Sequence, residues 1–182
     1  MAALISQSTL FARELGELPK GFSWHESDTC HAAVPVPKGW YVKEEGSGDT
    51  HSLTITKENI EQTGRYETGY TLSCYDSFSR TVGVGPSKYA ASIIEKVQQT
   101  NDKKNIVVEP WANVLTKGAV KGAGIRFRDA KPPPALIHYY FIANEQTDTL
   151  HFIIFEAPEA EWAAAWKLGE VMLTNVVVWS RR

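Results

Sequence analysis

Cysteine is scarce in this chain, and the cysteines present are not spaced like metal ligands. Cys30 and Cys74 are the two cysteines among 182 residues, and neither belongs to a CxxC pair. A zinc ribbon and a dithiol redox motif are therefore excluded. We expect two buried free thiols, with a structural disulfide as the alternative.

An excess of positive charge and a long hydrophobic run are also missing. The formal net charge is -2, whereas general nucleic-acid-binding proteins usually carry a basic excess. No stretch approaches the roughly 18 apolar residues of a membrane span, and the first residues lack the basic and apolar regions of a signal peptide. We therefore expect a cytoplasmic protein that neither binds nucleic acid nor spans a membrane.

Motifs for catalysis and cofactor binding are absent as well. The glycine-rich segment 83–86 lacks the Lys-Ser/Thr of a phosphate loop, and there is no HExxH or GxSxG motif. His138 and His151 lie on successive predicted strands and are candidates to face each other across a hairpin, but a third metal ligand is not evident. The sequence therefore predicts no catalytic residue, no metal site and no cofactor. Because catalytic triads are assembled in space, an enzyme stays as an alternative.

What the chain does contain fits a folded domain. Its residues are 43% hydrophobic and 22% charged, close to the average for globular proteins. A chain of this length buries enough surface to fold without disulfides or metals. We predict a single α+β domain over residues 22–182, preceded by an N-terminal arm or short helix over residues 1–21.

Extended segments account for most of the predicted domain. Prolines and alternating apolar residues predict strands, and short connections between them predict antiparallel pairing. Tyr70, Leu72 and Cys74 are spaced to share one strand face. The extended segments are expected over residues 31–36, 40–42, 52–56, 66–75, 105–116, 121–128, 135–143 and 149–156.

Two segments have the period of a helix. Pro86 suits a helix start, and apolar residues recur through Val97, so the first helix is expected to end near residue 101. Pro158 is expected to open the second, whose apolar stripe includes Gly169, a residue that lets a helix approach a sheet closely. The order strands, helix, strands, helix predicts a central, mostly antiparallel sheet with helices on its faces, an α/β/α sandwich.

Two short segments support a resemblance at the level of layout. A PKGW turn at Pro37–Trp40 follows the first predicted strand, and an FEAP junction at Phe155–Pro158 leads to Trp162. With the mid-chain helix, these features resemble the PsbP/Mog-type fold family over about residues 31–178. The resemblance implies an antiparallel sheet flanked by helices. It also implies non-catalytic work as a subunit, adaptor or chaperone, including chaperones of bacterial secreted effectors.

A basic cluster is the first candidate for partner binding. Arg126 and Arg128 are two residues apart, so they share one strand face. We interpret the cluster either as a dock for an acidic partner or as a solvated face that protects a sheet edge. Its members within fifteen residues are Lys117, Lys121, Arg126, Arg128 and Lys131.

Aromatic residues are the second candidate. The chain has six tryptophans and seven tyrosines, and these residue types are enriched at interface hot spots. Trp162, Trp166 and Trp179 either anchor a partner or close the core over the sheet. We expect all three to close the core.

The sequence leads to one main hypothesis and two alternatives. The main hypothesis is a non-catalytic protein-binding module, such as an adaptor, assembly factor or chaperone. The alternatives are a small-molecule-binding protein or enzyme with a pocket between helix and sheet, and a structural subunit of a homo-oligomer. The candidate partner-binding residues are Lys121, Arg126, Arg128, Lys131, Trp162 and Trp166.

Overall fold

The fold is that of a computed structural model, described over residues 15–113 and 120–179. The strands over these residues are β1 (Phe22–Ser27), β2 (Ala32–Pro37), β3 (Tyr41–Ser47), β4 (Thr50–Thr56), β5 (Gly69–Tyr75), β6 (Val107–Asn113), β7 (Val120–Asp129), β8 (Ala135–Asn144), β9 (Thr149–Pro158) and β10 (Val177–Val178). The helices are α1 (Ile60–Thr63), α2 (Phe78–Val82), α3 (Pro86–Thr100), the 3-10 turn η1 (Lys103–Asn105) and α4 (Trp162–Asn175).

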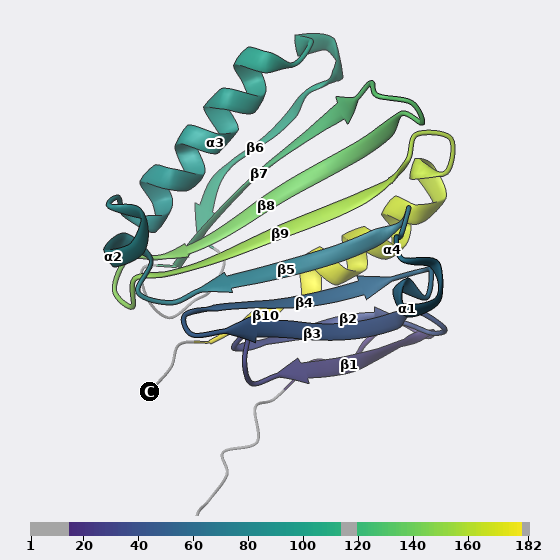
Figure 1. Ribbon diagram of the computed structural model, residues 1–182, viewed down its shortest axis with the longest axis horizontal. Helices are drawn as coiled ribbons and strands as arrows, with labels where there is room; N and C mark the ends of the chain where they lie inside the picture. The colour runs from purple at the N-terminus through teal and green to yellow at the C-terminus, as the bar shows by residue number, and fades with distance from the viewer. Residues whose placement is uncertain (1–14, 114–119, 180–182) are drawn as a thin grey trace, which may run out of the picture.

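The strands in the described part of the chain form two antiparallel sheets (Figure 1). The large sheet has the order β3-β4-β5-β9-β8-β7-β6, and the small sheet has the order β1-β2-β10. The ends of the large sheet are therefore β3 and β6. The predicted α+β class with a large antiparallel sheet is confirmed.

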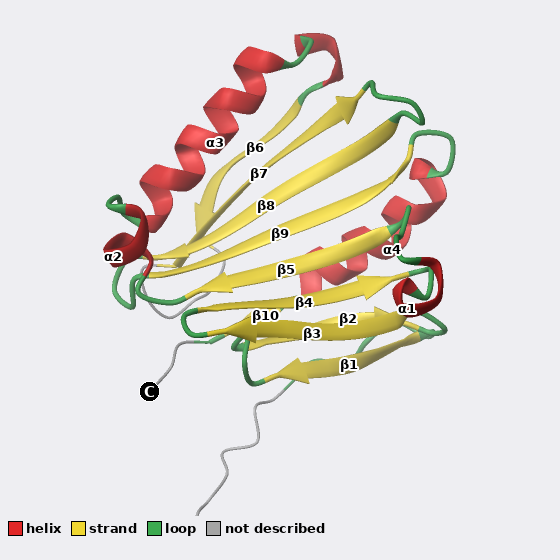
Figure 2. Cartoon of the chain, in the orientation of Figure 1, coloured by secondary structure: helices red, strands yellow, loops and turns green. Residues whose placement is uncertain are grey.

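Different elements cover the two faces of the large sheet (Figure 2). Helix α3 contacts β7, β8 and β9, over a core that includes Ile125 and Phe141. On the opposite face, α4 contacts β9 and β2, over a core that includes Leu72 and Phe155. Helices thus lie on both faces, but α4 shares its face with the small sheet, which the predicted sandwich did not include.

Two carboxylates in the hairpin between β8 and β9 bind the helix starts on the α3 side. Glu145 accepts a hydrogen bond from the backbone N–H of Ser87 at 2.8 Å. Asp148 accepts hydrogen bonds from the backbone N–H of Ser79 at 3.0 and 3.1 Å. Negative charge is stabilising at the positive end of a helix. The glycine turn before Pro86 therefore holds a protein carboxylate at the place where an anion site was considered.

Most predicted elements are found within a few residues of their expected ends. The strands β1 and β10, the short helices α1 and α2, and the turn η1 were not predicted. The prediction that Pro158 opens the last helix is wrong, because Pro158 ends β9 paired with Ala135, and α4 begins at Trp162. Of the predicted N-terminal arm, residues 1–14 lie outside the described residues. Among the described helices, none has the length and apolar character needed to span a membrane.

Helix α4 rests closely on β9 at its one glycine. A Cβ atom placed on Gly169 would lie 2.7 Å from the ring of Phe155, which is fully buried. That ring also makes edge contacts with Trp162 and Trp166, at centroid distances of 5.7 and 5.8 Å. Trp162 is 8% exposed, and Trp166 packs against the same core. The helix is therefore part of the core, as expected from its stripe.

Replacing Gly169 tests whether α4 packs directly against Phe155. Alanine has a higher helix propensity than glycine by about 1 kcal/mol, but its Cβ at position 169 would press on the Phe155 ring. We expect Gly169→Ala to lower the free energy of unfolding by about 1–3 kcal/mol, as overpacking does. Urea unfolding measures the change, and the exposed variant Ala164→Gly reports the propensity effect alone. A gain in stability for Gly169→Ala would contradict the close seat.

Candidate functional site

The edge strand β6 exposes more apolar surface than an edge strand usually does. Val107 is 47% exposed, Val108 is 43% exposed and Trp111 is 37% exposed. The pairing of β6 with β7 shifts between Glu109 and Ala112. A bulge of this kind, together with a proline at position 110, limits open-ended pairing with other strands. The edge is thus guarded against aggregation while it stays apolar.

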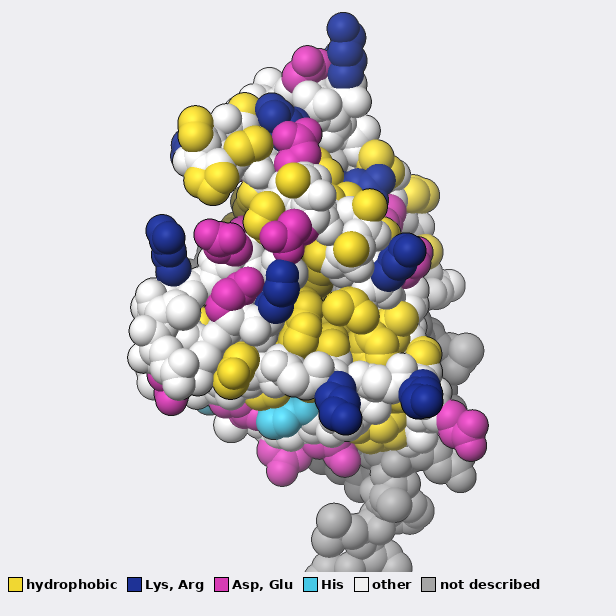
Figure 3. Space-filling view, turned by 90° about the vertical axis from the view of Figure 1, so that its right-hand side faces the viewer, with side chains coloured by type: hydrophobic (Ala, Val, Ile, Leu, Met, Phe, Trp, Pro, Cys, Tyr) yellow, Lys and Arg dark blue, Asp and Glu magenta, His cyan; other side chains and the backbone are white. Residues whose placement is uncertain are grey.

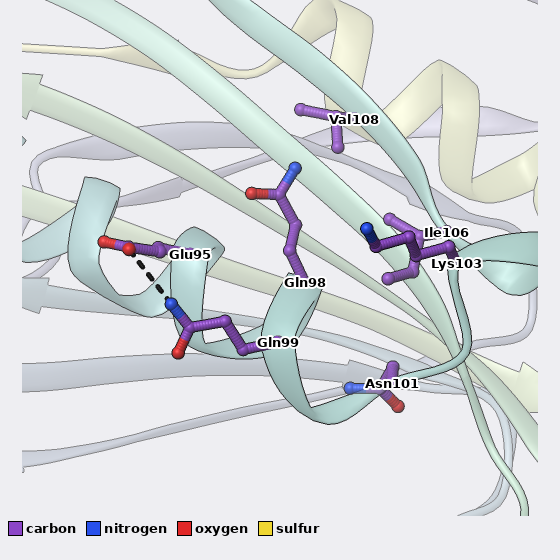
Figure 4. A pocket seen from close by; sticks show the side chains of 7 residues that line it. All are labelled: Glu95, Gln98, Gln99, Asn101, Lys103, Ile106 and Val108. Carbon is purple, nitrogen blue, oxygen red and sulfur yellow. Dashed lines mark hydrogen bonds between the residues drawn. The ribbon is translucent and has the colours of Figure 1, made fainter.

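A groove lies beside β6 on the face covered by α3 (Figure 4). Its volume is about 620 Å³. Gln98 extends from α3 toward Val108 on β6, whereas Gln99 lies along α3 and donates a hydrogen bond of 3.0 Å to Glu95 (Figure 4). The floor is apolar at Ile106 and Val108, and the rim is polar. We call this hollow the α3 groove, and its lining residues are Glu95, Gln98, Gln99, Asn101, Lys103, Ile106 and Val108.

A second hollow lies beside β6 on the opposite face, next to α4. Its volume is about 330 Å³, within the range of small ligand pockets. We call it the α4 cavity. Its lining residues are Glu109, His138, Tyr140, Trp166, Glu170, Leu173, Thr174 and Val176.

Gly124 in β7 determines how two lining residues of the α4 cavity lie. Glu109, Gly124 and Tyr140 are aligned across three neighbouring strands. A Cβ on Gly124 would lie 2.9 Å from Cδ2 of Tyr140 and 3.1 Å from Oε2 of Glu109. The missing side chain therefore lets the carboxylate and the phenol ring stand side by side above the bare backbone.

His138 forms the buried wall of the cavity. The residue is 1% exposed, and its Nδ1 has no hydrogen-bond partner. Its Nε2 lies 3.8 Å from the carboxylate of Glu109, too far for a hydrogen bond. Burial, together with the nearby charge of Arg126, lowers the pKa of His138 to about 4. The ring is therefore neutral at neutral pH.

Burial also changes the pKa of the acidic and phenolic groups of the cavity. Burial raises the pKa of Glu109, Arg126 opposes that rise, and Glu170 adds to it. Burial and the charge of Glu109 raise the pKa of Tyr140. The cavity therefore combines a neutral imidazole, a neutral phenol and carboxylates that lack close compensation.

The structure brings three of the predicted partner-binding residues together at the border of this cavity. Trp162 and Trp166 stack with a centroid distance of 5.1 Å. The guanidinium of Arg126 lies 5.8 and 5.6 Å from their ring centroids, in the range of a cation–π contact. Arg126 is thus held in place by the aromatic residues of α4.

The other basic residues do not join this group. Arg128 donates two hydrogen bonds of 2.8 Å to Glu159. Lys121 is four residues from Ile125 in β7, so the two share a face of the strand, and that face is covered by α3. Lys131 is exposed beyond the end of β7. The cluster is thus not one continuous strip; whether any member contacts a partner stays a prediction, and Lys117 lies outside the described residues.

Sequence reasoning missed the residues that shape the α4 cavity. Glu109, Gly124, Tyr140 and Glu170 come from three strands and a helix, and no motif links them. One signal was available, since Gly122 and Gly124 precede Arg126 at the alternating positions of one strand face. Small residues at such positions mark a place where something approaches the sheet closely.

The other histidine and the two cysteines considered in the sequence are buried within the fold. His138 pairs with Phe155 and His151 pairs with Ile142, so the prediction that the two histidines face each other is wrong. His151 is buried, and its Nε2 lies 3.0 Å from the carbonyl oxygen of Cys30. Cys30 and Cys74 are buried free thiols, as expected. Among the described residues, no group of three or more acidic, histidine or cysteine residues is arranged to hold a metal ion.

Apolar surface is not confined to β6. On the side where α4 begins, hydrophobic side chains form a continuous area bordered by charged side chains of both signs (Figure 3). Exposed apolar areas with a polar rim often mark interaction surfaces. The surface therefore offers more than one place for contact with another molecule.

The fold is shared with solved structures, although the sequence is not. No protein-family model matches the sequence, and no curated protein does. The structure is similar to the Ran-binding protein Mog1p of Saccharomyces cerevisiae, with a TM-score of 0.50 and 14% identity over 87% of this chain and 96% of that one. It is also similar to the cyanobacterial PsbP (CyanoP) of Synechocystis sp. PCC 6803, with a TM-score of 0.51 and 9% identity over 91% of this chain and 99% of that one. The chain thus has a PsbP/Mog-type fold.

The buried histidines predict a loss of stability in acid. Burial lowers the pKa of both His138 and His151 to about 4, whereas an unfolded histidine titrates near 6.5. Between these pH values the unfolded chain binds protons that the folded chain does not. The free energy of unfolding should therefore fall as the pH drops from about 6.5 to about 4, by up to about 3 kcal/mol for each ring.

His138→Phe separates the contribution of the cavity histidine. The variant keeps an aromatic ring of similar size and removes one titrating group and its unpartnered Nδ1. We expect urea unfolding at several pH values to show about half the acid-induced loss of the parent over this window. A slope equal to that of the parent would mean that His138 is already protonated in the folded state.

Proposed function

We propose that this chain is a non-catalytic protein-binding module that holds an extended segment of another protein along β6. The observation that carries this proposal is the apolar edge of β6 with a hollow on each of its faces. Sheet edges bind extended segments through the backbone hydrogen bonds that their outer side leaves unmade.

The two hollows suit the geometry of an added strand. Successive side chains of a strand point to opposite faces of the sheet. Side chains of the bound segment would alternate between the α3 groove, near Val108, and the α4 cavity, near Glu109. Backbone pairing would then supply affinity, and the two hollows would supply specificity. The bulge at Glu109–Ala112 would confine continuous pairing to short runs.

The comparisons support a binding role at the level of fold. Mog1p is by name a Ran-binding protein, so a fold of this type is compatible with protein binding, although fold alone does not fix function. Within this role we propose an adaptor, assembly factor or chaperone, with chaperoning of bacterial secreted effectors as one form. The proposed binding role assigns no catalytic step to the side chains that line either hollow.

A charge placed on the edge tests the proposal. Lysine on an edge strand opposes the addition of another strand, and Val108 is exposed enough to be replaced without loss of the core. We expect Val108→Lys to reduce capture of the partner by at least about tenfold, as measured by quantitative affinity capture with mass spectrometry. In the parent complex, hydrogen exchange should slow in β6.

The opposite edge of the same sheet provides the matched control. Val42 lies on β3 and is 38% exposed, close to the 43% of Val108. Val42→Lys should capture the partner as the parent does. Equal capture by Val108→Lys and the parent, or an equal loss in both variants, would overturn the assignment to β6.

A further inference from the structure

The α4 cavity contains two carboxylates without a cationic partner. Glu109 stands on β6, and its side chain is 46% exposed. Glu170 stands on α4 and is exposed. Among the described residues, no lysine or arginine forms an ion pair with either carboxylate, and the neutral ring of His138 lies 3.8 Å from Glu109. The cavity thus has a net negative rim.

Two aromatic rings form the buried wall of the cavity. His138 is 1% exposed, lines the cavity and has a nitrogen atom without a hydrogen-bond partner. The unpartnered Nδ1 is itself shut off from solvent, and its Nε2 lies 3.8 Å from the carboxylate of Glu109 at the cavity. Tyr140 lies on the same wall, and its ring is nearly parallel to that of His138, at a centroid distance of 6.3 Å.

The remaining wall is apolar. Trp166, Leu173 and Val176 supply it from α4 and the residues that follow. A long aliphatic stem packs well on such a wall while its charged end reaches carboxylates at the rim. Lysine and arginine side chains have this form, and a volume of about 330 Å³ is sufficient for one of them.

We infer that the α4 cavity binds one lysine or arginine side chain of the segment that lies along β6, with its charge between Glu109 and Glu170. This inference rests on the proposed function. Glu109 belongs to the edge strand itself, so a residue directly opposite it on an added strand would have its Cβ about 4.5–5.5 Å away. Opposite charges at such a position are favourable, so the cavity selects a basic residue there.

Arg126 does not satisfy the carboxylates in place of a ligand. Its guanidinium lies over Trp162 and Trp166, and no ion pair joins it to Glu109. The raised pKa of Glu109 agrees with this, because burial and Glu170 outweigh the opposing charge of Arg126. The guanidinium of Arg126 is instead engaged by the two tryptophan rings, and its charge acts on Glu109 without forming an ion pair with it.

A small probe tests the cavity without the partner. n-Butylguanidinium carries the head group and stem of an arginine side chain, and n-butylurea is a neutral compound of nearly the same shape. Titration of the full chain, followed by NMR of the Trp166 indole and the His138 ring, should show saturable shifts with n-butylguanidinium at a dissociation constant on the order of 1 mM. n-Butylurea should bind at least about tenfold more weakly. Equal binding of both compounds, or no saturable shift, would overturn the inference.

Removing the two charges tests their role. Glu109→Gln with Glu170→Gln keeps the size of both side chains, and we expect binding of n-butylguanidinium to weaken by at least about tenfold. Glu95→Gln, in the α3 groove on the other face of the sheet, is the matched control and should bind as the parent does. Unchanged binding in the double variant would contradict the inference.

Capture of the partner by the double variant identifies the source of the cation. If the cation is a basic side chain of the bound segment, the double variant Glu109→Gln with Glu170→Gln should capture the partner about tenfold less well. Its capture should also lose most of its salt dependence. Loss of probe binding with unchanged partner capture would assign the cavity to a free small cation and overturn the inference. That result would leave the proposed function intact, because Val108→Lys tests it independently at the edge.

Discussion

The close approach of α4 to β9 at Gly169 determines how much of the large sheet is covered. Because position 169 has no side chain, the helix rests directly on the ring of Phe155, and its two tryptophans close around that ring. The helix is thereby fixed over β9 and beside β2. It does not extend across the sheet to β6, so one face of the last strands stays open next to the helix.

That open face explains why the α4 cavity forms where it does. At Gly124 the sheet has no side chain of its own, so Glu109 and Tyr140, which line the cavity, lie close over its backbone. On the opposite face, α3 lies over β7 to β9 and leaves the α3 groove at its border with β6. The same edge strand therefore has exposed apolar side chains and a hollow on each of its faces.

Several charged and aromatic residues that stand out in the sequence make contacts within the fold. Arg128 forms a two-bond ion pair with Glu159, which connects β7 to the turn before α4. Arg126 lies over the tryptophan pair of α4. A residue already engaged within the chain has less to offer a partner than its charge suggests. The groups that lack such engagement, the carboxylates and His138 of the α4 cavity, are scattered in the sequence and gave no motif.

The sequence by itself determined most of the longer elements and their inward faces. The period of 3.6 residues predicted α3, alternation placed Tyr70, Leu72 and Cys74 on one buried face, and Gly169 within an apolar stripe indicated a helix close to a strand. Only the tertiary structure decided what lies opposite each face. The small sheet depends on the two residues of β10 pairing with β2, and the α4 cavity joins Glu109 to residues as distant as Val176. Local periodicity records that a side chain is buried or exposed, but it carries no information on which distant element meets it.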